Sequence, residues 1–231
     1  MKDPAATRAS TWIGAIAAII AAACYSSFLL SPWTHAARSA GGGFISELEA
    51  PGQPFAWLYR TSDVLAGLGV IAAAWAVRRL IAGRRWSVLA VVLMVLAGAS
   101  SILDAATSMQ CDPNASARCA QGEHTALGLL GQLVNVHTDS GLLGFLGGAA
   151  GASILGVVIA DRWPGWGRVQ IALGIGIASC GLADIGLLLA SSDIGWAERI
   201  RVLLTSGWFL VVGLFLLHDH IVSRPGTAET L

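Results

Sequence analysis

Charged side chains are scarce in this sequence, and their scarcity excludes an ordinary soluble domain. Only 12% of the 231 residues are charged and 55% are hydrophobic, whereas soluble domains carry about a quarter charged residues. The 14 lysines and arginines balance 14 aspartates and glutamates, so the chain has no basic excess of the kind that binds nucleic acid. The sequence also lacks a phosphate-binding loop, a dinucleotide fingerprint, a nucleophile elbow and a haem pair.

Long polar, proline-rich or serine-rich linkers are missing as well. The few charges are grouped, so apolar runs of about 18 to 23 residues lie between them, which is the length that crosses a hydrocarbon core about 30 Å thick. The sequence therefore predicts an all-α fold, a polytopic membrane protein with a single domain over residues 1–231 and six transmembrane helices. The expected spans are about 12–30, 62–77, 86–106, 136–160, 169–190 and 202–217.

Positive charge is shared unevenly between the two sides of these spans. The side of the termini carries nine of the 14 lysines and arginines, namely Lys2, Arg8, Arg78, Arg79, Arg84, Arg85, Arg162, Arg168 and Arg224, and the other side carries the remaining five, Arg38, Arg60, Arg118, Arg199 and Arg201. Cytoplasmic loops are enriched in lysine and arginine. We therefore expect a multi-pass protein of the inner (plasma) membrane with both termini in the cytoplasm.

Two cysteines lie close together in the loop after the third span. Cys111 and Cys119 are separated by seven residues, and the expected topology places this loop outside the cytoplasm, where oxidising conditions favour disulfides. We expect a disulfide between them. Two free thiols or a metal pair remain the alternatives, although the spacing fits no common zinc site.

Acidic residues recur at one height in different spans. Asp104, Asp63 and Asp184 lie 18, 15 and 16 residues from the cytoplasmic ends of their spans, hence about 27, 22 and 24 Å up at 1.5 Å per residue. Further ionisable residues open the fourth and sixth spans on that same side. Carboxylates near hydrocarbon are costly unless they face a partner, a polar cavity or water, so this convergence indicates a polar site open to the outer face.

The residues at this height supply acids, bases and cations for three kinds of chemistry. The candidate catalytic residues are Asp63, Asp104, His137 and Asp139; the candidate substrate-binding residues are Arg60, Asp184, Arg199 and Arg201; and the candidate metal ligands are His124, His137 and Asp139. Histidines and carboxylates can hold a divalent metal such as zinc, a histidine and an aspartate can do acid–base work without metal, and carboxylates can carry protons or cations in transport.

A purely structural role is the alternative for each of these residues. Asp63 and Asp104 would then form ion pairs with Arg60 and Arg201 that fix helix register. Asp139 and Glu198 would cap helix N-termini. For any single residue we favour the structural role. For the whole set we favour a functional site, because an isolated ion pair does not require so many spans to contribute at one height.

Two stretches of the sequence carry a family resemblance. They are Ile45-Ser46-Glu47-Leu48 with Pro51-Gly52, Trp57 and the segment from Asp63 to Gly67, and the segment from Asp104 through Met109-Gln110-Cys111-Asp112-Pro113 to Cys119 and His137. Over residues 12–215 the chain resembles a family of bacterial six-helix membrane proteins known as domain of unknown function 998. The resemblance implies six spans and an outward polar face but no activity. The sequence departs from the family pattern at Gln110 and at Thr138-Asp139.

A more distant likeness is to the alkaline ceramidases and progestin-receptor-like membrane hydrolases. Those proteins combine serine, aspartate and three histidines near one membrane face, and the likeness implies hydrolysis of a lipid. Their paired C-terminal histidines are missing here, which puts zinc in doubt.

These observations favour a membrane-embedded enzyme that acts on a membrane lipid or another hydrophobic small molecule at the outer leaflet, by hydrolysis. The first alternative is a transporter or ligand-binding membrane protein that uses the same carboxylates. The second is a non-catalytic partner subunit of a membrane complex. A homo-oligomer is compatible with each of the three.

Overall fold

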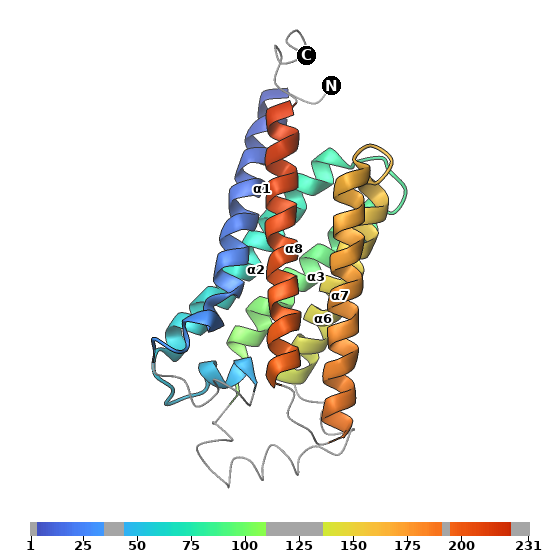
Figure 1. Ribbon diagram of the computed structural model, residues 1–231. Coiled ribbons are helices and arrows are strands. Elements are labelled where there is room, and N and C mark those ends of the chain that lie inside the picture. Colours follow the sequence, from blue (N-terminus) through green and yellow to red (C-terminus); the bar gives the residue numbers. More distant parts are fainter. Residues whose placement is uncertain (1–3, 35–43, 110–135, 191–194, 223–231) are drawn as a thin grey trace.

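The computed structural model describes residues 4–34, 44–109, 136–190 and 195–222, and within these ranges it contains helices and no strand (Figure 1). The long helices are α1 (Pro4–Tyr25), α2 (Ala56–Leu80), α3 (Ser87–Ala106), α6 (Val136–Ile159), α7 (Pro164–Leu189) and α8 (Gly195–Val222). Two short 3-10 helices, η1 (Ser27–Leu30) and η3 (Ile45–Glu49), lie between α1 and α2. The predicted all-α, six-helix architecture is confirmed.

The long helices form a closed ring in chain order. Each packs against the helices before and after it in the order α1, α2, α3, α6, α7, α8, and α8 packs back against α1. In Figure 1, α1 begins and α8 ends at the same end of the bundle, which also carries the α2–α3 and α6–α7 turns. We call this the terminal end. The opposite end, which carries η3, is the η3 end.

The outer faces of the helices are suited to lipid. Four helices, α3, α6, α7 and α8, are long and apolar enough to cross a membrane by length and composition, and α1 and α2 complete the same ring. Large apolar side chains are exposed on these faces; Ile13, Val88 and Leu182 are 62%, 74% and 65% exposed. Soluble monomers rarely expose so much contiguous apolar surface. The chain is therefore a membrane-embedded helical bundle.

Tryptophans mark the two ends of the bundle. Trp33, Trp57 and Trp196 are exposed at the η3 end, and Trp75 and Trp86 are exposed at the terminal end, where arginine guanidinium groups lie 5.0 to 5.5 Å from their ring centroids. Such aromatic belts are typical of membrane interfaces. Trp57 and Trp75 are about 27 Å apart along α2 at 1.5 Å per residue, which matches one hydrocarbon thickness.

Close contact between α2 and α3 positions the acidic residues. Gly67 and Gly98 meet backbone to backbone, so a Cβ atom on Gly98 would lie 2.6 Å from the carbonyl oxygen of Gly67. Small residues allow this approach in membrane helices. Near this contact, Ser101 Oγ donates a hydrogen bond to the main-chain oxygen of Asp63 at 2.8 Å. The two helices are thereby fixed at the height where Asp63 and Asp104 lie.

The observed helix boundaries differ from the predicted spans mainly at their ends. The first span was expected to continue to residue 30, but α1 ends at Tyr25 and the chain continues into η1. Ser26 Oγ donates to the main-chain oxygen of Ala22 at 2.9 Å, which is a local side-chain bond that competes with helix continuation. In contrast, α2 begins at Ala56 and not at residue 62, directly after Phe55 in a left-handed conformation with φ 59°.

Candidate functional site

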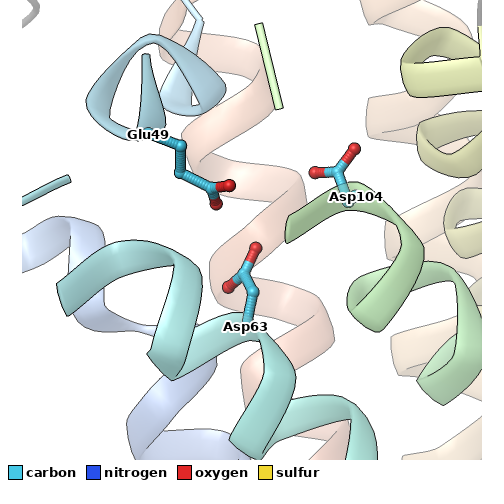
Figure 2. Close-up of side chains that lie close together, drawn as sticks. All are labelled: Glu49, Asp63 and Asp104. Atoms are coloured by element: carbon cyan, nitrogen blue, oxygen red, sulfur yellow. The ribbon is translucent and has the colours of Figure 1, made fainter. Parts of the chain in front are cut away.

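Three carboxyl groups converge at the η3 end. Glu49 comes from η3, Asp63 from α2 and Asp104 from α3, and one oxygen of each lies within 4.8 Å of the others. Figure 2 shows the three side chains pointing toward one another. We call these three residues the carboxyl cluster.

Apolar packing holds η3 over this end of the bundle. Leu48, next to Glu49, is 2% exposed and packs in a small hydrophobic cluster with Phe28, Tyr59 and Val202. Burial of a leucine side chain is worth about 1.5–3 kcal/mol. This packing fixes η3, which is too short to cross the membrane, and places Glu49 next to the ends of α2 and α3.

Hydrogen bonds fix both ends of η3. At its start, the main-chain N–H of Ile45 donates to Glu198 Oε2 on α8 at 2.9 Å. At its end, Arg60 Nε and Nη2 on α2 donate to the main-chain oxygen of Glu49 at 2.9 and 2.5 Å. The arginine predicted to bind substrate therefore positions an acidic residue of the cluster.

Asp104 connects the carboxyl cluster to α6. Its Oδ1 atom lies 3.0 Å from His137 Nδ1 and accepts a hydrogen bond from Ser140 Oγ at 2.7 Å. His137 and Ser140 are three residues apart, so they lie on the same face of the helix. The side chains of His137 and Asp104 are 19% and 25% exposed. Part of each side chain is therefore exposed at the surface of the bundle.

Glu49 is the most enclosed member of the cluster, at 4% exposure. Burial, followed by the negative charge of Asp104, raises the pKa of Glu49 to about 7, although a hydrogen bond with Asp63 opposes this rise. Two carboxyl groups that share a hydrogen bond hold one proton between them. Glu49, hydrogen-bonded to Asp63, therefore holds a proton near neutral pH, next to the carboxylate of Asp104 that lies 3.0 Å from a histidine.

A second polar group lies between α7 and α8. Arg201 Nε pairs with Asp184 Oδ2 at 2.6 Å, and Arg201 Nη2 lies 3.8 Å from Glu198 Oε1. Arg199, in contrast, donates to the main-chain oxygen of Gly195 in its own helix at 2.7 Å. Asp184 and Arg201 were predicted to bind substrate, and the structure places them in a largely buried ion pair that joins two helices.

The structure gathers only part of the predicted set. Asp63, Asp104 and His137 lie in one cluster and not in three separate helix contacts. The alternative pairing of Asp63 with Arg60 and of Asp104 with Arg201 is wrong for Arg201, because its partners are Asp184 and Glu198. Arg60 binds a main-chain oxygen.

Asp139 lies in the first turn of α6, two residues after His137 and therefore about 200° away around the helix axis. These two residues cannot both face Asp104 or converge on one ion from the same helix face. His124, Cys111 and Cys119 lie outside the described residues, so the predicted third metal ligand and the predicted disulfide stay predictions.

Glu49 is the residue that the sequence interpretation missed. It belongs to the segment that carries the family resemblance, but it follows no apolar span from which a height could be counted. A usable signal was present: Ile45 and Leu48 are apolar residues three positions apart, which indicates one buried helical turn with Glu49 beside it.

The fold and the site together define a polytopic helical membrane protein with a carboxyl–histidine cluster near one end of its bundle. The family model described as protein of unknown function (DUF998) matches residues 13–214, and the chain belongs to this family. No curated protein and no solved structure matches the chain. The predicted family is therefore confirmed, and its function has to be argued from the site.

Proposed function

We propose that this protein is a membrane-embedded hydrolase that cleaves an ester or amide bond of a lipid or another hydrophobic molecule. One observation carries the proposal: Asp104 contacts His137 on one side and belongs on the other side to a carboxyl cluster that retains a proton. Acid–base catalysis requires one group that accepts a proton next to another group that keeps its proton at the same pH.

His137 acts as the general base. Because Nδ1 lies 3.0 Å from the carboxylate of Asp104, we assign the imidazole proton to Nδ1, which leaves Nε2 as the basic nitrogen. The carboxylate also stabilises the imidazolium that forms when Nε2 takes a proton. The hydrogen bond from Ser140 to the same Asp104 oxygen holds the carboxylate in place.

The Glu49–Asp63 pair acts as the electrophile. Its shared proton donates a hydrogen bond to the carbonyl oxygen of the substrate, as a neutral carboxylic acid in an enclosed site can do at pH 7. Water then attacks the carbonyl carbon while His137 takes the proton of that water. The tetrahedral intermediate collapses, and His137 returns the proton to the leaving oxygen or nitrogen, so that an acid and an alcohol or amine are released.

The depth of the cluster supports a hydrophobic substrate. Asp63 is six residues beyond the exposed Trp57, hence about 9 Å inside the level of the aromatic belt. This depth lies among the acyl chains of the membrane, and a water-soluble substrate would have to leave solvent to reach it. A lipid already lies there.

The distribution of arginine supports a site on the extracytoplasmic side of an inner membrane. Arg78, Arg79, Arg84 and Arg85 gather in the α2–α3 turn at the terminal end, far from the carboxyl cluster, and positive residues favour the cytoplasmic side. Alkaline phosphatase fused within residues 110–135 should be active, and a fusion after Arg85 should be inactive. The reverse pattern would place the site in the cytoplasm.

The activity can be tested in proteoliposomes made from purified full-length protein and a mixed lipid extract. Mass spectrometry should detect released fatty acid or amine with the wild type and none with His137→Ala, whereas Asp139→Asn, on another face of the same helix, should retain activity. Identical lipid profiles for wild type and His137→Ala would refute the hydrolase. Proton or cation flux that depends on Asp63 would instead support a transporter.

Thermal stability separates chemistry from structure before any substrate is known. Asp63→Asn and Asp104→Asn remove charge from a crowded acidic cluster, so a catalytic cluster predicts unchanged or higher melting temperatures together with lost activity. If these residues served as structural ion pairs, each change would strand a buried charge and cost about 3–5 kcal/mol. Lowered melting temperatures for both variants would therefore argue against a catalytic site.

A further inference from the structure

The carboxyl cluster contains more negative charge and more oxygen ligands than its protein partners satisfy. Glu49, Asp63 and Asp104 each offer one oxygen within 4.8 Å of the others, from three different elements (Figure 2). Clustered carboxylates alone can simply share protons. A ligand is indicated only if a buried polar atom is also left without a partner.

Glu49 supplies such an atom. Asp63 shares a hydrogen bond with the Glu49 carboxyl group, but the Glu49 Oε2 atom is buried and has no hydrogen-bond partner within the ranges that the structure describes, and Glu49 as a whole is 4% exposed. In Figure 2 its carboxyl group points toward Asp63 and Asp104. A buried carboxyl oxygen without a partner is costly, and a cation in the cluster would satisfy it.

The neighbouring protein cations have other partners. Arg201 pairs with Asp184 and Glu198, and Arg60 donates to a main-chain oxygen. His137 Nδ1 lies 3.0 Å from Asp104, and the charges of His137 and Arg60 also act on Glu49, although less strongly than burial and Asp104 do. Within the part of the chain that the structure describes, no arginine or lysine side chain forms an ion pair with any of the three carboxyl groups, so a proton or an added cation would complete their charge compensation.

We infer that Glu49, Asp63 and Asp104 form a binding site for a hard divalent cation of the size of Ca²⁺. Carboxylate oxygens suit Ca²⁺, Mg²⁺ and Mn²⁺, whereas zinc sites are usually completed by histidine or cysteine. Ca²⁺ binds oxygens at about 2.3–2.6 Å, so two of its ligands lie up to about 5 Å apart. The spacing of the cluster admits this ion without movement of the helices.

The other hydrogen bonds and contacts of these residues would hold the metal ligands in position. His137 and Ser140 hold Asp104 through one oxygen, Oδ1, and Arg60 holds the main chain of Glu49. Partners of this kind orient metal ligands in proteins. The inference deepens the proposed function, because the bound cation would polarise the substrate carbonyl in place of the shared proton, but binding of the cation is tested without any substrate.

Binding is expected to compete with protons. Carboxyl ligands must lose their protons to bind a metal, and three carboxyl oxygens that lie within 4.8 Å of one another must all be deprotonated to share one ion. Ca²⁺ should therefore bind at least tenfold more weakly at pH 5.5 than at pH 7.5.

The test uses purified full-length protein in detergent, stripped with chelator and titrated with Ca²⁺ by calorimetry. We expect wild-type binding at pH 7.5, at least tenfold weaker binding in Glu49→Gln and Asp63→Asn, and no change in the matched control Asp139→Asn at the same end. Mg²⁺ should bind more weakly and Zn²⁺ should not compete. No Ca²⁺ binding by the wild type, equal binding by Glu49→Gln, or a preference for Zn²⁺ would overturn the inference.

Proton release by the wild-type protein tests the site even if the variants fail to fold. In weakly buffered solution at pH 7, Ca²⁺ should release protons from the wild-type protein in proportion to the sites filled, because clustered carboxyl groups give up the protons they share when they bind a metal. Ca²⁺ binding without proton release would place the ion elsewhere and refute the site. Hydrolysis that persists in chelator would leave the proposed enzyme standing and would show that the cation is not needed for its activity.

Discussion

The enclosed position of Glu49 predicts that the protein becomes less stable as the pH rises toward neutrality. The ordinary pKa of this carboxyl group is 4.5 and that in the folded protein is about 7, so the folded state binds a proton more tightly than the unfolded chain. Stability is then complete below about pH 4.5 and falls as the pH passes through about 7. A decrease, and not the usual increase, is expected over this range.

The size of the effect follows from the same two values. Each of the about 2.5 pKa units of difference is worth about 1.4 kcal/mol, and the part of the effect that falls between pH 4.5 and 7.5 is about 3 kcal/mol. Glu49 is 4% exposed, so solvent screens this contribution little. For a chain of this length, about 1 kcal/mol changes the melting temperature by about 2–4 °C, which gives a fall of about 6–12 °C between pH 4.5 and 7.5.

The assay is a melting curve of the detergent-solubilised protein at several pH values in the presence of chelator, which removes competing cations. Glu49→Gln keeps a neutral side chain of the same shape and should lose most of the pH dependence. Asp161→Asn, which changes an exposed carboxylate in the turn at the terminal end, should keep it. A wild-type melting temperature that is flat or rises over this range, or an equal slope in Glu49→Gln, would refute the reasoning.

Two further predictions concern packing. Asp184→Asn should lower stability by about 3 kcal/mol, because it leaves Arg201 with only the more distant glutamate inside the bundle; a melting temperature equal to that of wild type would show that the pair contributes nothing. Gly98→Ala should lower stability by about 1–3 kcal/mol through overpacking, since its Cβ would overlap the carbonyl of Gly67, whereas Gly141→Ala meets open space and should melt no lower than wild type. Equal melting temperatures for the two glycine variants would contradict the close helix contact.

Hydropathy was sufficient to predict the helices but not their ends. The apolar middle of each span is unambiguous in sequence, whereas α2 and α8 extend beyond it through polar residues such as Arg60 and Arg199. Near a membrane interface a helix can keep its hydrogen bonds while its side chains reach water. The loss of apolar character therefore does not mark the end of the helix.

Counting residues from one end of a span predicted the height of the site but not the direction of each side chain. Asp63, Asp104 and His137 meet because they also face the same interior, whereas Asp139 shares their height and lies on another face of α6. Rotation about the helix axis is set by contacts such as Gly67 with Gly98, and a single sequence does not say which helices pair. The position of Glu49 could not be predicted from the sequence, because it is set by the packing of Leu48 against other helices.

The depth of the carboxyl cluster also exposes it to the electric field of an energised membrane. A positive charge that moves from the level of Trp57 to Asp63 travels about 9 Å of the about 27 Å between the two aromatic belts, which is about a third of the low-dielectric path. At about 2.3 kcal/mol per elementary charge per 100 mV, this step is worth about 0.8 kcal/mol for a proton at 100 mV. The occupancy of the cluster therefore changes with membrane voltage, by an amount equivalent to roughly half a pH unit.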